Sequence, residues 1–182
     1  GAIIALPHMG SWEASASATF NSGIPLFSFA ATQKNPLVDA YMNRLREGPG
    51  IEALPRTQTS LKKILKKLKN GKVLAILPDV RMREKALTVP FLNGHANIGA
   101  GMAMFARHTN APIYPCIVRR KGWIQHSIEL LAPINPDPSL SKDEDIQRMT
   151  NDVFKIFNDA ILKNPEQWFW YNKRWILDPI ET

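Results

Sequence analysis

The sequence has one cysteine, no long hydrophobic run and no nucleophile motif. Cys116 is alone among 182 residues, which excludes a disulfide framework and is typical of a reducing compartment. No stretch approaches the roughly eighteen uninterrupted apolar residues that a membrane-spanning helix needs. The four histidines are scattered and lack metal-ligand spacing. A G-x-S-x-G elbow is missing, which argues against a serine hydrolase.

Acidic residues are also scarce relative to basic ones. There are 23 Lys and Arg against 16 Asp and Glu, giving a net charge of +7. This surplus favours an anionic partner, which can be nucleic acid, anionic lipid or an acidic protein. A nucleic-acid-binding domain would interleave basic and aromatic residues on one exposed surface, whereas most aromatic residues here follow core spacing.

Length and composition predict one globular domain over residues 1–182, with 45% apolar residues. The chain opens on Gly1, without methionine, directly inside an apolar stretch. We therefore expect a piece of a longer protein whose N-terminal membrane anchor and first elements are missing.

Apolar runs alternate with amphipathic segments along the chain. This alternation predicts an α/β fold with a central mixed, mostly parallel sheet flanked by helices. A capping box, Ser141-x-x-Glu144, opens the last predicted helix. The expected strands are 3–6, 26–31, 73–77, 113–119 and 123–131, with an extended segment and turn at 89–94; the expected helices are 37–46, 60–69, 97–107 and 142–162.

The stretch that follows the first strand, PHMGSWE at 7–13, carries the first candidate site. His8 ends a buried strand, and Glu13 falls in the first turn of the next helix, with Ser11 as its cap. A turn between them lets the carboxylate accept a hydrogen bond from one imidazole nitrogen, which leaves the other nitrogen free to act as a general base. The alternative is a histidine bonded to backbone beside a surface glutamate.

Other candidates stand at the ends of predicted elements. Asp79 follows the strand at 73–77 and is expected at the same sheet edge as His8, where ligands collect. Arg44 and Arg46 lie near the end of the helix at 37–46, either in a site or simply solvated. Lysines on the helix at 60–69 form a basic face that suits anionic lipid or an acidic carrier protein, or is only a solvated face.

Six segments in order resemble one family, the lipid A biosynthesis (lauroyl/myristoyl) acyltransferases, within the His-x4-Asp/Glu glycerolipid acyltransferase superfamily. They are HMGSWE at 8–13, NPLVD at 35–39 followed by arginines, LPD at 77–79, VPFLNG at 89–94, NAPIYP at 110–115 and PEQWFW…RW at 165–175. The chain departs from the family pattern at Val80-Arg81 and at Asn172.

The resemblance implies a glycerolipid acyltransferase-like fold and transfer of a fatty acyl chain from acyl carrier protein to a hydroxyl of a lipid A precursor, in lipopolysaccharide biosynthesis. It implies His8 as general base and Glu13 as its charge-relay partner. Arg46 would hold a phosphate or the acyl donor, with Arg44 as a substitute, and Asp79 would bind substrate.

The resemblance implies no metal and no cofactor. The co-substrate would be a fatty acyl chain carried by acyl carrier protein or by coenzyme A. The implied partners are acyl carrier protein, the lipid A precursor and an anionic membrane surface, at the cytoplasmic face of a bacterial inner membrane, and no nucleic acid. The alternative is an acyl-CoA-dependent enzyme acting on another glycolipid, such as a phosphatidylinositol mannoside.

Overall fold

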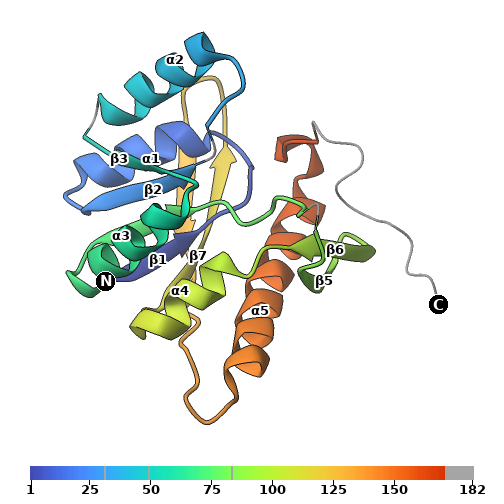
Figure 1. The fold of residues 1–182 in the computed structure, drawn as a ribbon. Coiled ribbons are helices and arrows are strands. Elements are labelled where there is room, and N and C mark those ends of the chain that lie inside the picture. The colour runs from blue at the N-terminus through green and yellow to red at the C-terminus, as the bar shows by residue number, and fades with distance from the viewer. Residues whose placement is uncertain (31, 49, 83, 171–182) are drawn as a thin grey trace.

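A six-stranded sheet forms the centre of the chain (Figure 1). The computed structural model describes residues 1–170, apart from 31, 49 and 83. The strand order is β3-β2-β4-β1-β7-β8, in which all neighbours are parallel except β8, which runs antiparallel to β7. The sheet is therefore mixed and mostly parallel, as predicted. Its strands are β1 (Ala2–Ala5), β2 (Leu26–Ala30), β3 (Glu52–Pro55), β4 (Val73–Ile76), β7 (Ile113–Arg120) and β8 (His126–Leu130).

Helices cover both faces of this sheet. Alternating side chains of β1 divide the core, because Ile3 belongs to one cluster of buried residues and Ile4 to another. The Ile3 side packs against α3, α4 and α5, and the Ile4 side packs against α1. The helices are α1 (Trp12–Asn21), α2 (Pro36–Glu47), α3 (Gln58–Lys69), α4 (Gly101–Thr109) and α5 (Lys142–Lys163).

The predicted helix at 97–107 is wrong at its start. Residues 87–98 form a separate hairpin of β5 (Leu87–Phe91) and β6 (Gly94–Ile98), and α4 begins only at Gly101. The two loop residues, Leu92 and Asn93, have φ angles of 49° and 64°, as a two-residue hairpin turn requires. The side chain of Asn97 then accepts from the backbone of Ala86, which fixes it in the strand.

The last helix was predicted more closely. In α5 the Ser141 hydroxyl accepts from the Glu144 backbone, and the Glu144 side chain accepts from the Ser141 backbone, so the capping box is confirmed. A short 3₁₀ helix, η1 (Pro165–Gln167), follows α5. Among the described residues, no helix combines the length and the apolar character needed to cross a membrane.

Candidate active site at the carboxyl edge of the sheet

The ends of β1 and β4 bring His8 and Asp79 together. The two strands are parallel, with Ala5 opposite Ile76, and each continues through Leu-Pro to its polar residue. His8 and Asp79 each lie three residues beyond this matched pair, so the parallel strands place the two side chains next to each other. Asp79 Oδ1 lies 2.7 Å from His8 Nδ1, and Asp79 Oδ2 accepts the backbone N–H of His8 at 2.8 Å.

The Asp79 carboxylate is buried beneath the imidazole. Its side chain is 0% exposed, and Oδ2 also accepts the indole N–H of Trp168 at 3.0 Å. With a carboxylate as acceptor, the neutral imidazole of His8 carries its hydrogen on Nδ1, and its lone pair is then on Nε2. Trp12 packs edge-on against the imidazole, with ring centroids 5.3 Å apart. The resemblance implied substrate contact by Asp79; in the structure its carboxylate contacts His8 and Trp168.

The chain after α5 fastens the turn that carries His8. Phe169 donates its backbone N–H to the His8 carbonyl at 2.8 Å, and Gly10 donates to the Gln167 carbonyl at 2.9 Å. Gly10 has a φ angle of 62°, and a side chain there would come within 2.6 Å of the Val118 carbonyl oxygen. Only glycine fits this turn, which therefore holds the imidazole in a fixed position.

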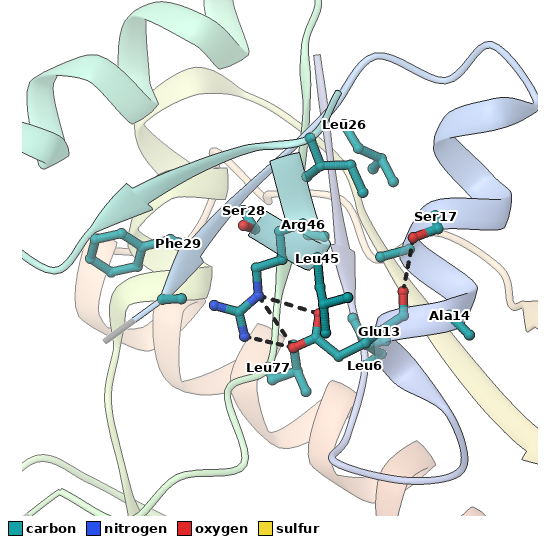
Figure 2. A pocket seen from close by; sticks show the side chains of 14 residues that line it. Leu6, Glu13, Ala14, Ser17, Leu26, Ser28, Phe29, Leu45, Arg46 and Leu77 are labelled. Carbon is teal, nitrogen blue, oxygen red and sulfur yellow. Dashed lines mark hydrogen bonds and ion pairs between the residues drawn. The ribbon is translucent and has the colours of Figure 1, made fainter. Parts of the chain in front are cut away.

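Glu13 lies in the first turn of α1, as predicted, but its partner is Arg46 near the end of α2 (Figure 2). Arg46 Nη2 is 2.6 Å from Glu13 Oε1, and Arg46 Nε is 3.3 Å from each carboxylate oxygen. No hydrogen bond joins Glu13 to His8 in the described structure. The His-x4-Glu spacing predicted a pairing of His8 with Glu13. In the structure Nδ1 of His8 instead contacts Asp79, which follows the neighbouring strand β4.

Two cavities adjoin at this edge, and the Glu13–Arg46 ion pair lies in their shared wall. The first, the His8 cavity, measures about 280 Å³ over the strand ends; it is lined by His8, Glu13, Arg46 and Arg56 among others. The second, the apolar cavity, measures about 270 Å³ between α1, α2 and the sheet; it is lined largely by aliphatic side chains, including Leu6, Leu26, Leu45, Ile51 and Leu77 (Figure 2).

The remaining candidates are placed less centrally. Arg44 is exposed, with its guanidinium 5.5 Å from the Tyr41 ring, and lines neither cavity. Asn172 and the end of the PEQWFW…RW segment lie outside the described residues. Within the described part of the chain, no group of three or more His, Cys, Asp or Glu side chains is arranged to hold a metal ion.

Sequence reasoning missed two residues of the site, Trp168 and Arg56. In the sequence Trp168 is only one member of an aromatic segment, and Arg56 follows a strand, β3, that the residue pattern does not predict. One signal was available for the Asp79 pairing. The tripeptides at 6–8 and 77–79, Leu-Pro-His and Leu-Pro-Asp, match in their first two residues.

Fold and site together define an α/β protein in which a histidine contacts a buried carboxylate. This histidine lines one cavity, and an apolar cavity lies beside it. The family model for bacterial lipid A biosynthesis acyltransferases matches residues 1–176, so the chain belongs to this family. The resemblance drawn from the six sequence segments is thereby confirmed.

Individual relatives are distant. A phosphatidylinositol mannoside acyltransferase of Mycolicibacterium smegmatis is 23% identical over 98% of this chain and 58% of its own length. One of Mycobacterium tuberculosis is 23% identical over 100% of this chain and 57% of its own length. A lipid A biosynthesis acyltransferase of Haemophilus influenzae is 26% identical over 92% of this chain. The chain spans between 51% and 58% of the length of these relatives.

Proposed function

We propose that the protein transfers a fatty acyl chain from a thioester donor to a hydroxyl of a lipid A precursor, with His8 as the general base. The pairing of His8 Nδ1 with a fully buried Asp79 carboxylate carries the proposal, since it leaves Nε2 as the acceptor at the His8 cavity. Family membership supports the class of reaction.

In the proposed reaction the acceptor hydroxyl oxygen attacks the thioester carbonyl carbon while its proton passes to Nε2 of His8. Asp79 stabilises the imidazolium that forms. The tetrahedral oxyanion collapses, the carbon–sulfur bond breaks, and the proton moves from Nε2 to the leaving sulfur. A thioester is already activated, so this chemistry requires neither a protein nucleophile nor a cofactor.

The apolar cavity suits the acyl chain. It adjoins the His8 cavity through the wall that contains Glu13, Arg46 and Phe29, so a chain placed there has its carbonyl near the imidazole. Each buried methylene contributes about 0.8 kcal/mol. The depth of this cavity would then determine which acyl-chain length the protein prefers.

We propose acyl carrier protein as the donor, supported by an exposed basic face on α3. Four of the predicted lysines on this helix are exposed, namely Lys62, Lys63, Lys66 and Lys69. Lys67 differs, because its amine contacts Glu52 at 2.6 Å. The second candidate function uses acyl-CoA and a phosphatidylinositol mannoside acceptor, which the names of the mycobacterial relatives favour.

We further propose that the protein works against an anionic membrane surface, at the cytoplasmic face of a bacterial inner membrane. The loop between β7 and β8 supports this. Trp123 and Ile124 are each 90% exposed there, and the Arg120 guanidinium lies 5.9 Å from the Trp123 ring, with Lys121 adjacent. Amphipathic aromatic and cationic side chains are typical of protein that contacts lipid headgroups.

The test is an acyl-transfer assay with acyl carrier protein and acyl-CoA donors, each against a lipid A precursor and a phosphatidylinositol mannoside, with products read by mass spectrometry. We expect product from acyl carrier protein and the lipid A precursor, lost in His8→Ala. The control is His108→Ala, an exposed histidine on α4. A folded His8→Ala protein with unchanged transfer would refute the mechanism.

A further inference from the structure

The His8 cavity contains a cation that no acidic side chain neutralises. Arg46 is paired with Glu13, whereas Arg56 makes no ion pair and no hydrogen bond within the described part of the chain. The Arg56 guanidinium lies 5.9 Å from the ring of Phe29, which lines the same cavity. A guanidinium that lies over an aromatic ring keeps N–H groups free for a planar or tetrahedral anion.

The sheet fixes where this cation stands relative to the base. Arg56 directly follows β3, whose last residue, Pro55, pairs with Ala30 of β2. From β3 to β1 there are three steps in the strand order, about 14 Å at the usual strand spacing. Arg56 therefore lies at the same carboxyl edge as His8 but well away from the reacting atoms.

The other described lining groups leave the positive charge of Arg56 without an acidic partner. Gln33 adds an amide to the same cavity. Gly99 and Gly101 also line the cavity, where α4 begins without a side-chain cap, and a helix start carries a partial positive charge. Glu13 is the acidic side chain among the described lining residues, and it already forms an ion pair with Arg46.

We propose that Arg56 binds a phosphate group of a substrate held in the His8 cavity, and so anchors that substrate across the ends of β3, β2, β4 and β1. This rests on the proposed function, and it moves the phosphate contact from Arg46, where the family resemblance placed it, to Arg56. Bidentate hydrogen bonds from a guanidinium suit phosphate better than a point charge does. The phosphate can belong to the glycolipid acceptor or to the phosphopantetheine arm of the donor.

The experiment measures binding, not turnover, on the intact protein by ligand-observed NMR titration at one fixed ionic strength. Two matched pairs of probes separate the sources of phosphate: phosphopantetheine against pantetheine, and glucosamine phosphate against glucosamine. The variants are Arg56→Gln and Arg56→Lys. Arg44→Gln is the matched control, because Arg44 is also an exposed arginine whose guanidinium lies over an aromatic ring, and it lines neither cavity.

We expect the unmodified protein to bind the phosphorylated member of one pair at least tenfold more tightly, which is about 1.4 kcal/mol. Arg56→Gln should abolish this preference, Arg56→Lys should retain part of it, and Arg44→Gln should retain all of it. The pair that shows the preference identifies the phosphate as that of the donor or of the acceptor.

Three results would overturn the proposal: no preference for either phosphorylated probe, a preference that persists in Arg56→Gln, or a preference that disappears in Arg44→Gln. The His8→Ala assay is independent of these titrations. Failure of the acyl-transfer mechanism therefore shows in that assay, and failure of the Arg56 contact shows in the binding ratios.

Discussion

Replacing Asp79 with asparagine removes the charge beneath His8 while keeping the size of the side chain. In the present structure Oδ1 of Asp79 is 2.7 Å from His8 Nδ1, and Oδ2 receives both the His8 backbone N–H and the Trp168 indole N–H. An asparagine can satisfy one side of this arrangement only. If its oxygen faces the two N–H donors, its amide N–H₂ faces Nδ1, and the imidazole must carry its hydrogen on Nε2.

The expected loss is large because two effects add. The carboxylate no longer stabilises the imidazolium, and the favoured tautomer no longer accepts a proton at Nε2. A buried aspartate that orients a catalytic histidine is worth roughly 10⁴ in kcat by the serine-protease precedent. This corresponds to about 5.4 kcal/mol of transition-state free energy, at about 1.36 kcal/mol for each tenfold change.

Glu13→Gln is the informative comparison, since the sequence pattern selected Glu13 for the same role. Glutamine keeps one oxygen for Arg46 but loses the ion pair, whose side chains are 35% and 17% exposed. For a partly exposed pair we expect a cost of about 1 to 2 kcal/mol in unfolding free energy. Turnover should fall by about tenfold or less, since the imidazole keeps Asp79.

The assay is single-turnover acyl transfer by both variants, with folding checked by thermal unfolding and circular dichroism. The reasoning predicts a loss at least a hundredfold larger for Asp79→Asn than for Glu13→Gln. If folded Asp79→Asn stays within tenfold of the unmodified enzyme while Glu13→Gln loses a thousandfold, then Glu13 is the partner during catalysis and the pairing seen here is not the active one.

Further predictions concern the cavities, the surface and the core. Trp168→Phe keeps the ring but removes the N–H to the buried carboxylate, so kcat should fall about tenfold, with KM unchanged in steady-state kinetics. Ala16→Leu fills part of the apolar cavity, and competition between donors of different length should shift towards shorter chains, by about fourfold in affinity for each excluded methylene. Trp123→Ser combined with Ile124→Ser should weaken sedimentation with phosphatidylglycerol vesicles at least tenfold; equal binding by the double variant would remove this loop from the membrane contact. Burial raises the pKa of the Cys116 thiol from 9.0 to about 11, so iodoacetamide should alkylate it slowly in the folded protein at pH 9 and rapidly after unfolding. Because the neutral thiol is favoured in the folded state, its contribution to stability is present below pH 9 and is lost as pH rises towards about 11.

The sequence was sufficient for elements whose burial is strongly patterned. The apolar runs of β1 and β4 and the capped, amphipathic α5 follow directly from residue type and spacing. In contrast, β3 was not predicted, because only Leu54 in its Glu-Ala-Leu-Pro sequence is buried and it lies at an edge of the sheet. The β5–β6 hairpin depends on positive φ angles at Leu92 and Asn93, which no hydrophobic pattern records.

For the site, the sequence indicated the sheet edge at which His8 and Asp79 lie, but not which side chains contact each other there. His8 and Asp79 were both expected after strands, and the structure brings them into contact. That they are neighbours depends on β4 lying beside β1, and strand order is a property of the whole fold. The spacing from His8 to Glu13 is visible in the sequence, whereas the approach of Arg46 from α2 is not. In the structure His8 therefore contacts Asp79, and Glu13 contacts Arg46.

The positions of these groups follow from one geometrical fact: parallel strands end at a common edge. His8 follows β1, Asp79 follows the adjacent β4, and Arg56 follows β3, which lies two strands beyond β4. Glu13 and Arg46 come from helices instead. Their ion pair joins α1 to α2 where the His8 cavity and the apolar cavity meet. Since the Glu13 carboxylate is paired with Arg46 in that wall, Asp79 is the carboxylate that contacts the imidazole, and the two acidic residues hold different parts of the site.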